Sequence, residues 1–162
     1  MRAPRLARLG GALVVLLSMG RPALAQAREA AVIVNPANPN DSMSFQELVK
    51  IFKQEKQTWE DGKKIYLLVQ EAGSVERDVV LKTIYRMNND GLKSLWLGKL
   101  FREEIAAFPH TVASNEGMKR FVSQVPTAIG FIDAAMLDAT VKALRIDGKL
   151  PGEPGYPLKD PE

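Results

Sequence analysis

The sequence contains no cysteine and a single histidine among its 162 residues. The lack of cysteine excludes disulfide bonds and thiolate metal sites. With His110 as the only imidazole, a metal site or a catalytic triad would need carboxylates from elsewhere in the chain. The short signatures of serine hydrolases, zinc proteases, phosphate-loop NTPases and dinucleotide-binding enzymes are also missing. We therefore predict a protein that is not an enzyme and that uses no metal or cofactor.

The chain also lacks any apolar run long enough to cross a bilayer, which takes about 20 residues. Its first 25 residues instead have the three parts of a secretory signal peptide. Three arginines precede an apolar run from Leu9 to Met19, and Ala23-Leu24-Ala25 forms a cleavage site of small residues. The alternative, a signal anchor that stays in the membrane, is disfavoured by the turn-forming Gly20-Arg21-Pro22. We predict cleavage after Ala25 and a periplasmic or secreted protein without a membrane span.

Removal of this segment changes the charge balance. The whole chain has 22 basic and 19 acidic residues, which give a formal net charge of +3. The leader holds four arginines and no acid, so 18 basic and 19 acidic residues remain and the net charge becomes −1. This remaining part has no dense cluster of lysine and arginine, and the basic footprint of a nucleic-acid-binding protein is therefore absent.

Residues 26–150 alternate between strand and helix patterns, which is typical of an α/β domain. Apolar runs typical of buried strands occupy residues 31–34, 65–69, 128–132 and 141–146. Helical periodicity or helix caps occur over residues 44–52, 74–87, 92–108, 114–125 and 134–137. We predict a three-layer α/β fold with a mixed, mostly parallel sheet covered by helices. Residues 151–162 are rich in proline and glycine and are expected to form a flexible tail.

Local signals within these elements give more detailed expectations. Ser44 and Glu47 have the spacing of a capping box at a helix start. Gly130 lies inside a predicted strand, which indicates close approach of another segment to the backbone. Trp59 and Trp96 are interpreted as anchors of the core.

The helix start that follows Gly73 is the candidate site. Gly73 allows a sharp turn, and Ser74 is a good N-cap. The backbone amides of Val75, Glu76 and Arg77 then point out of the helix start, where free N–H groups and the helix dipole favour anions. Arg77 can add a guanidinium suited to two oxygens. The alternative is an ordinary capped helix that binds nothing, and the acids Glu76 and Asp78 in the first turn favour this alternative.

The remaining polar candidates are weaker. His110 stands in a predicted loop between Pro109 and Thr111 and is interpreted as a surface residue. Glu103 and Glu104 are interpreted as part of a solvated helix face and not as an acid–base pair.

The order of the segments resembles one family. The pieces that carry the resemblance are Val32–Pro36, Ser44–Phe52, Trp59–Ile65, Gly73-Ser74, Ala128–Ile132, Val141–Lys149 and Gly155–Leu158. In order and spacing they are similar to the phosphate-type periplasmic substrate-binding proteins of ABC transporters, in the short variant called the PBP-like domain. Relatives of full length have two lobes with the ligand between them. The resemblance implies that residues 26–150 form a single lobe of a type II periplasmic binding protein.

The phosphate loop of that family reads Gly-Ser-Gly-Thr at a helix start. Gly73 and Ser74 match it, whereas Val75 replaces the second glycine and Glu76 replaces the threonine. The resemblance implies that residues 73–77, including Arg77, face a small oxyanion such as phosphate and serve an ABC-type uptake system. A second lobe would come from a homodimer or from another periplasmic protein. The alternative is a protein-interaction module that kept the lobe and lost the ligand.

Overall fold

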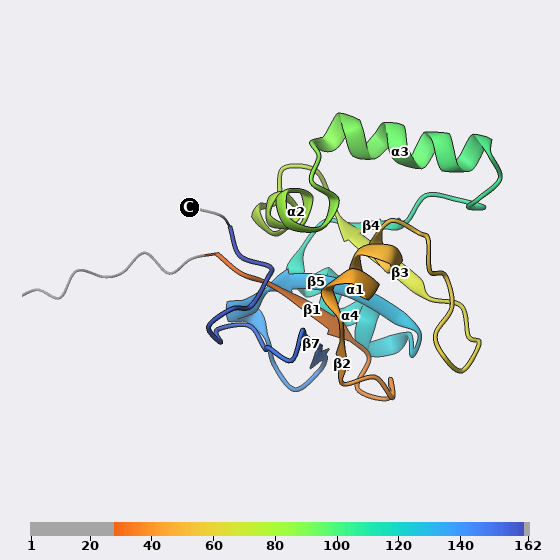
Figure 1. Cartoon of the computed structure of the whole chain (residues 1–162). Coiled ribbons are helices and arrows are strands. Elements are labelled where there is room, and N and C mark those ends of the chain that lie inside the picture. The colour runs from red at the N-terminus through yellow and green to blue at the C-terminus, as the bar shows by residue number, and fades with distance from the viewer. Residues whose placement is uncertain (1–27, 161–162) are drawn as a thin grey trace, which may run out of the picture.

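The computed structural model describes residues 28–160, and the predicted signal peptide lies outside them. The strands are β1 (Ala30–Val34), β2 (Ser42–Met43), β3 (Tyr66–Gln70), β4 (His110–Val112), β5 (Ala128–Asp133), β6 (Lys142–Ala143) and β7 (Arg145–Ile146). The helices are α1 (Phe45–Phe52), α2 (Val75–Val80), α3 (Asn89–Phe101) and α4 (Asn115–Gln124), with a π-helical turn η1 (Leu81–Tyr85) and a 3-10 turn η2 (Ala134–Met136). Figure 1 shows their arrangement.

The central sheet has five strands in the order β4-β3-β5-β1-β6. Strand β3 is parallel to both β4 and β5, whereas β1 is antiparallel to β5 and to β6. The short strands β2 and β7 form a separate parallel pair. The prediction of a mixed α/β sheet covered by helices is confirmed, and the antiparallel part is the contribution of β1.

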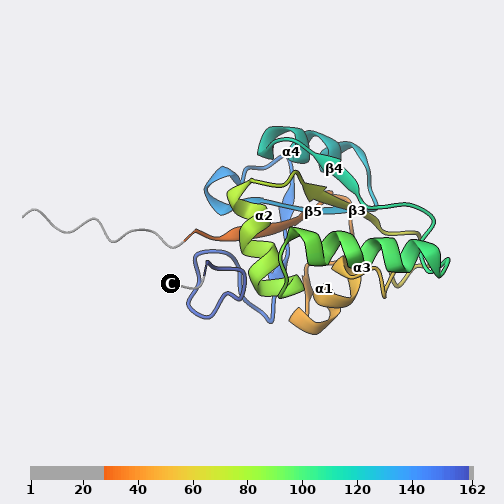
Figure 2. The same ribbon diagram turned by 90° about the horizontal axis from the view of Figure 1, so that it is seen from above.

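Helices cover both faces of the sheet. Figure 2 shows α4 on one side and α1, α2 and α3 on the other. Strand β1 is fully buried, and its residues alternate between the two sides: Val32 and Val34 pack with the α1–α3 layer, and Ala31 and Ile33 pack with α4. Burial on both faces explains why this strand reads as an uninterrupted apolar run.

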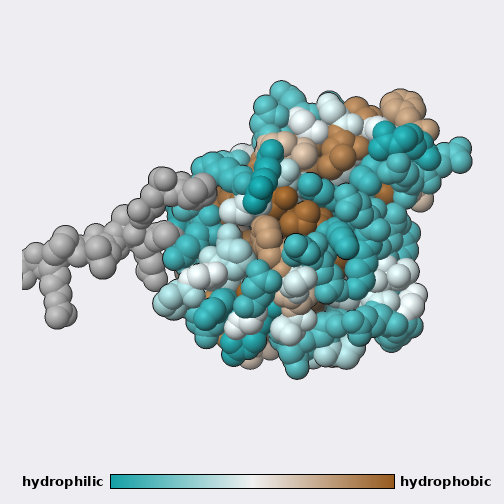
Figure 3. Space-filling model, in the orientation of Figure 1, coloured by the Kyte–Doolittle hydropathy of each residue, from teal (hydrophilic) through white to brown (hydrophobic). Residues whose placement is uncertain are grey.

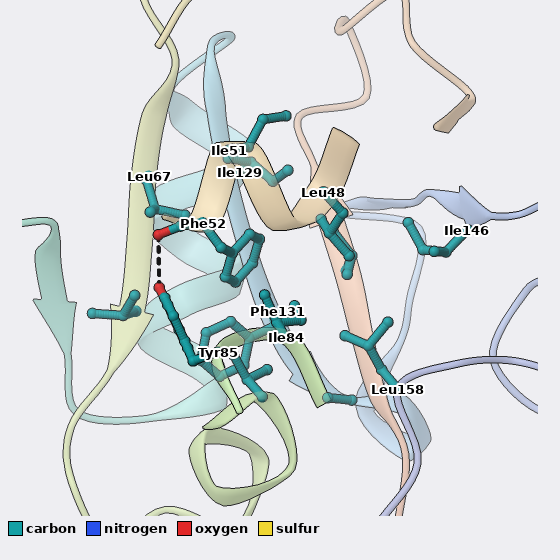
Figure 4. Packing of buried hydrophobic residues seen from close by; sticks show 14 of the residues in the cluster. Leu48, Ile51, Phe52, Leu67, Ile84, Tyr85, Ile129, Phe131, Ile146 and Leu158 are labelled. Atoms are coloured by element: carbon teal, nitrogen blue, oxygen red, sulfur yellow. Dashed lines mark hydrogen bonds between the residues drawn. The ribbon is translucent and has the colours of Figure 1, made fainter. Parts of the chain in front are cut away.

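The core consists of two clusters of buried residues, and the larger cluster lies under α1 and the π-helical turn (Figure 4). The Phe52 ring packs against the rings of Tyr85 and Phe131, with centroids 6.1 and 6.0 Å away. The buried Tyr85 hydroxyl donates a hydrogen bond of 3.0 Å to the Phe52 carbonyl. Burial of this hydroxyl away from water disfavours the charged phenolate and raises the pKa of Tyr85. Trp59 and Trp96 are both 6% exposed, as expected of core anchors.

Helix α4 approaches the sheet closely at Gly130, as its sequence position predicts. A Cβ atom added at Gly130 would collide with the sulfur of Met118 on α4 and would contact Leu68 on β3. The glycine therefore makes room for a fully buried methionine side chain.

Several element boundaries differ from the sequence prediction. The predicted helix over residues 74–87 is α-helical only to Val80 and then widens into the π-helical turn, which ends at Arg86 with a φ of +54°. The predicted helix over 92–108 begins at Asn89 and ends at Phe101, because Glu103 takes a left-handed conformation with a φ of +58°. Strands β2 and β4 were not predicted, and the predicted strand over 141–146 is divided into β6 and β7.

Residues 151–160 are not a flexible tail, contrary to expectation. Tyr156 and Leu158 are buried in the main core, and the Tyr156 hydroxyl donates a hydrogen bond of 2.8 Å to the Ala30 carbonyl. The Ala30 amide donates to the Leu158 carbonyl at 3.0 Å. Proline and glycine are needed here for turns, and the aromatic and aliphatic side chains between those turns hold the segment beside β1.

Candidate functional site

The carboxyl ends of β3, β4 and β5 lie at one edge of the sheet, because these strands are parallel. A helical element begins soon after each strand: Ser74 caps α2, Ser114 caps α4 and Asp133 caps the 3-10 turn. The amino end of β1 reaches the same edge, since Ala30 pairs with Asp133. In α/β sheets ligands bind at the carboxyl ends of parallel strands, so this edge is the candidate site.

The start of α2 presents two free donors at this edge. Gly73 is exposed and has a φ of +92°, which lets the chain turn sharply out of β3. The Ser74 hydroxyl accepts a hydrogen bond of 3.2 Å from the Arg77 amide. Within residues 28–160, the amides of Val75 and Glu76 have no hydrogen-bond acceptor. Of the three amides singled out from the sequence, two are therefore open and that of Arg77 is occupied.

The side chain of Arg77 points into the protein and not toward a ligand. It is 9% exposed, and its Nη1 donates to the Gln70 carbonyl at 2.5 Å. Its Nε donates to the Asn89 Oδ1 at 2.8 Å. Burial is the main influence on this group and lowers the pKa of Arg77. This placement corrects the expectation that Arg77 offers its guanidinium to an oxyanion: the group ties the end of β3 to the start of α3.

A polar network behind the helix start was not found from the sequence. The buried Gln70 donates from Nε2 to the Asn115 Oδ1 at 2.7 Å and to the Phe131 carbonyl at 3.2 Å. Asn115 in turn donates from Nδ2 to the Glu76 Oε1 at 3.1 Å and accepts from the Asp133 amide at 3.2 Å. Asn115 thus joins the ends of β3 and β5 to Glu76. The only local signal was a polar residue, Gln70, at the end of an apolar strand.

A depression of about 170 Å³ lies beside the helix start. It is lined by Arg28, Glu29, Val75, Glu76, Val79 and Asp133. Arg28, Glu29 and Asp133 also line a neighbouring open depression of about 510 Å³. The smaller depression therefore has three carboxylates and one guanidinium, and this balance opposes a multiply charged anion.

His110 is the first residue of β4 and not part of a loop, and it is exposed as expected. Its ring packs against Phe121 on α4 and Tyr66 on β3, with centroids 5.2 and 6.3 Å away. Glu104 is exposed and pairs with Lys99.

Across residues 28–160, no group of three or more acidic or histidine side chains is placed to hold a metal ion. No helix in this described part has the length and apolar character of a membrane span.

The fold of this chain is similar to part of several solved structures. No protein-family model matches the sequence, and no curated protein matches it. Among solved structures, an ABC-type phosphate transport receptor from Vibrio cholerae is similar, with a TM-score of 0.67 and 24% identity over 82% of this chain. PstS from Borrelia burgdorferi has a TM-score of 0.62 and 20% identity, also over 82% of this chain. The chain shares its fold with part of a phosphate ABC transporter substrate-binding protein.

A third similar structure, described as a phosphate ABC transporter substrate-binding protein from Clostridium perfringens with bound phosphate, has a TM-score of 0.61 and 20% identity over 75% of this chain. This chain covers 46% of that protein, 54% of the Vibrio receptor and 55% of the Borrelia protein. It therefore spans about half the length of the substrate-binding proteins that it matches, which agrees with the predicted single lobe. At these identities the likeness concerns the fold.

Proposed function

We propose that this chain is an exported solute-binding-like lobe that recognises a small oxyanion at the start of α2. The observation that carries the proposal is the pair of open amides of Val75 and Glu76, on a fold shared with phosphate-binding proteins. They lie at the sheet edge where α/β proteins bind ligands. The predicted signal peptide supports a periplasmic or secreted location, and we propose a role in an ABC-type uptake system.

The recognition chemistry uses donors that the helix start leaves free. The two amides and the positive end of the helix dipole attract a negatively charged oxygen. The Ser74 hydroxyl accepts from Arg77 and keeps its own proton to donate. No covalent bond is made or broken. The Glu76 carboxylate stands beside these donors and repels an anion, so a singly charged oxyanion such as dihydrogen phosphate is favoured over a dianion.

A single lobe supplies one wall of a binding cleft. An anion on this wall stays partly in water, which weakens each hydrogen bond. Millimolar affinity, about −4 kcal/mol, is the expected strength. A second copy of the chain or another exported protein would supply the opposite wall and raise the affinity.

Calorimetry with phosphate, sulfate and small carboxylates tests the proposal. Ser74→Ala is expected to remove the binding heat, and Ser44→Ala is the matched control. Both serines cap a helix by accepting an amide hydrogen bond, and each substitution is expected to cost about 1 kcal/mol of stability. Ser44 caps α1, whereas Ser74 caps α2, so the control changes a different helix start. No binding heat at millimolar ligand, or equal loss in both variants, would count against the proposal.

A second experiment restores the loop of the resembled family. The double substitution Val75→Gly and Glu76→Thr removes a carboxylate and adds a hydroxyl beside the same amides. We expect phosphate affinity to rise about tenfold, which is the effect of removing roughly one repulsive contact at 4 Å in a partly solvated site. An unchanged or lower affinity in a folded double variant would show that this helix start does not face the ligand.

The alternative function is a ligand-free interaction module that uses the same edge. Two observations favour it: the Val75 side chain is 39% exposed, and Arg77 is used internally. Light scattering together with chemical cross-linking separates the two functions. A stable complex through residues 73–76 that excludes phosphate supports the module, and a monomer that binds phosphate supports solute recognition.

A further inference from the structure

A groove separate from this edge runs between α1 and the π-helical turn. Its open volume is about 500 Å³, and Phe45, Val49 and Ile84 form an apolar floor. Ser74 and Arg86 stand at opposite ends of one continuous helical segment, so the groove does not belong to the anion site. In the view of Figure 3, which has the orientation of Figure 1, hydrophobic surface lies near the middle of the molecule among hydrophilic residues.

The rim of the groove carries positive charge. Lys50, Lys53 and Arg86 line it, and none of the three forms an ion pair with any residue in the range 28–160. Two neighbouring lysines differ in this respect, because Lys56 pairs with Glu47 and Lys82 pairs with Asp160. Glu55 is the only acid that lines the groove, so three cations against one anion leave a net charge of +2.

The backbone at this place is irregular. The helical segment changes from α to π at Leu81, and Arg86 ends it in a left-handed conformation with φ +54° and ψ +42°. For a residue with a side chain this left-handed conformation is unfavourable. π-Helical turns are frequent at functional sites. This backbone conformation places Arg86 in the lining of the groove.

We propose that this groove binds an acidic, amphipathic peptide segment of a partner protein. The floor residues Phe45 and Val49 are one helical turn apart on α1, Lys50 follows on the same helix, and Lys53 caps its carboxyl end. The binding surface is thus a strip about 12 Å long, the length of the eight-residue α1. A strip of this shape suits a second helix that lays apolar side chains on the floor and carboxylates toward the rim. Charge complementarity selects acidic partners.

The test uses a defined probe, a helical peptide of about 15 residues made of Leu, Ala and Glu with one apolar face. Amide spectra of the labelled protein are recorded during the titration. We expect shifts over residues 45–53 and 84–86, and an affinity that falls as salt is added. A peptide of the same pattern with lysine in place of glutamate is expected not to bind.

Charge-reversal variants supply the decisive comparison. The pair Lys50→Glu and Lys53→Glu is expected to weaken binding about tenfold, since two attractive surface pairs become repulsive. Lys93→Glu is the matched control, because Lys93 is exposed on α3 and lies outside the groove. Val49→Thr should also weaken binding while the positive rim remains intact. Circular dichroism confirms that each variant is folded.

Four outcomes would overturn the proposal, and the first three concern the peptide titration. They are shifts located elsewhere on the protein, equal binding by the double charge-reversal variant and the Lys93 variant, and binding to vesicles of anionic phospholipid without binding to the peptide. Concentration-dependent self-association through the groove would also overturn it, because the occupant would then be a second copy of this chain. The anion titration at Ser74 has a separate readout, so failure of one proposal leaves the other standing.

Discussion

The role of Arg77 can be tested by removing its side chain. The guanidinium donates to the Gln70 carbonyl and to Asn89, and the residue is 9% exposed. A hydrogen bond from a charged donor contributes about 1.5–3 kcal/mol, and a buried acceptor left without its partner costs about 1–3 kcal/mol. We take the lower figure, about 1.5 kcal/mol, for the bond to Asn89, because Asn89 is only half-buried. With a similar contribution of about 1.5 kcal/mol from the bond to the Gln70 carbonyl, we expect Arg77→Ala to destabilise the protein by about 3 kcal/mol.

This loss is large for a domain whose whole stability is about 5–15 kcal/mol. Urea unfolding followed by tryptophan fluorescence measures it, since Trp59 and Trp96 are both buried. Arg120→Ala is the control, because Arg120 is exposed on α4, and its effect should stay within about 0.5 kcal/mol. Arg77→Lys should fall between the two, because lysine keeps a charge but not the two-sided geometry.

Stability and anion binding are expected to respond differently to a change at Arg77. Arg77→Lys is expected to lower stability and to leave anion affinity nearly unchanged, because the guanidinium does not face the open edge. A variant of normal stability that has lost all phosphate binding would refute this assignment. That result would restore the direct ligand contact expected from the sequence.

Three further predictions concern packing, backbone conformation and pH. Gly130→Ala is expected to destabilise by about 1–3 kcal/mol through overpacking, and Met118→Ala should relieve this cost in a double-mutant cycle of unfolding measurements. Gly73→Ala is expected to cost about 1 kcal/mol, because its φ is +92° although the space around it is open. A hydrogen bond from Lys119, followed by those from the Thr140 hydroxyl and amide, holds the pKa of Asp138 at about 2, so its stabilising effect is present above pH about 4 and is lost as pH falls toward 2. Lys119→Met should raise the pKa of Asp138 in a carboxyl NMR titration, and a carboxyl that still titrates near 2 would contradict the pairing.

The sequence predicted the parts of the fold that depend on local patterns. The apolar run of β1 and the periodicity of α1 and α4 were recognised because burial imposes those patterns on neighbouring residues. The capping box shows the limit of this reasoning. Ser44 does accept from the Glu47 amide, but the Glu47 carboxylate binds Lys56 instead of the backbone of Ser44. Spacing identified the helix start but not the partner of the charged side chain.

The candidate site was predicted only in part, for a related physical reason. The turn at Gly73 and the cap at Ser74 are local and were found. The hydrogen-bond partners of the Arg77 guanidinium were not found, because they depend on where the end of β3 and the start of α3 meet. The bond from Asn115 to Glu76 joins residues 39 positions apart, and no local pattern encodes it. Strand β4 was missed because only three residues form it, and two of them are polar.

The most direct test of the central claim is an amide NMR titration of the protein with phosphate. The amides of Val75 and Glu76 should show the largest shifts, saturating at millimolar phosphate, while the Arg77 amide, held by Ser74, moves less. Shifts that are absent at residues 75 and 76, or that are centred on exposed lysines elsewhere, would contradict oxyanion recognition at this helix start.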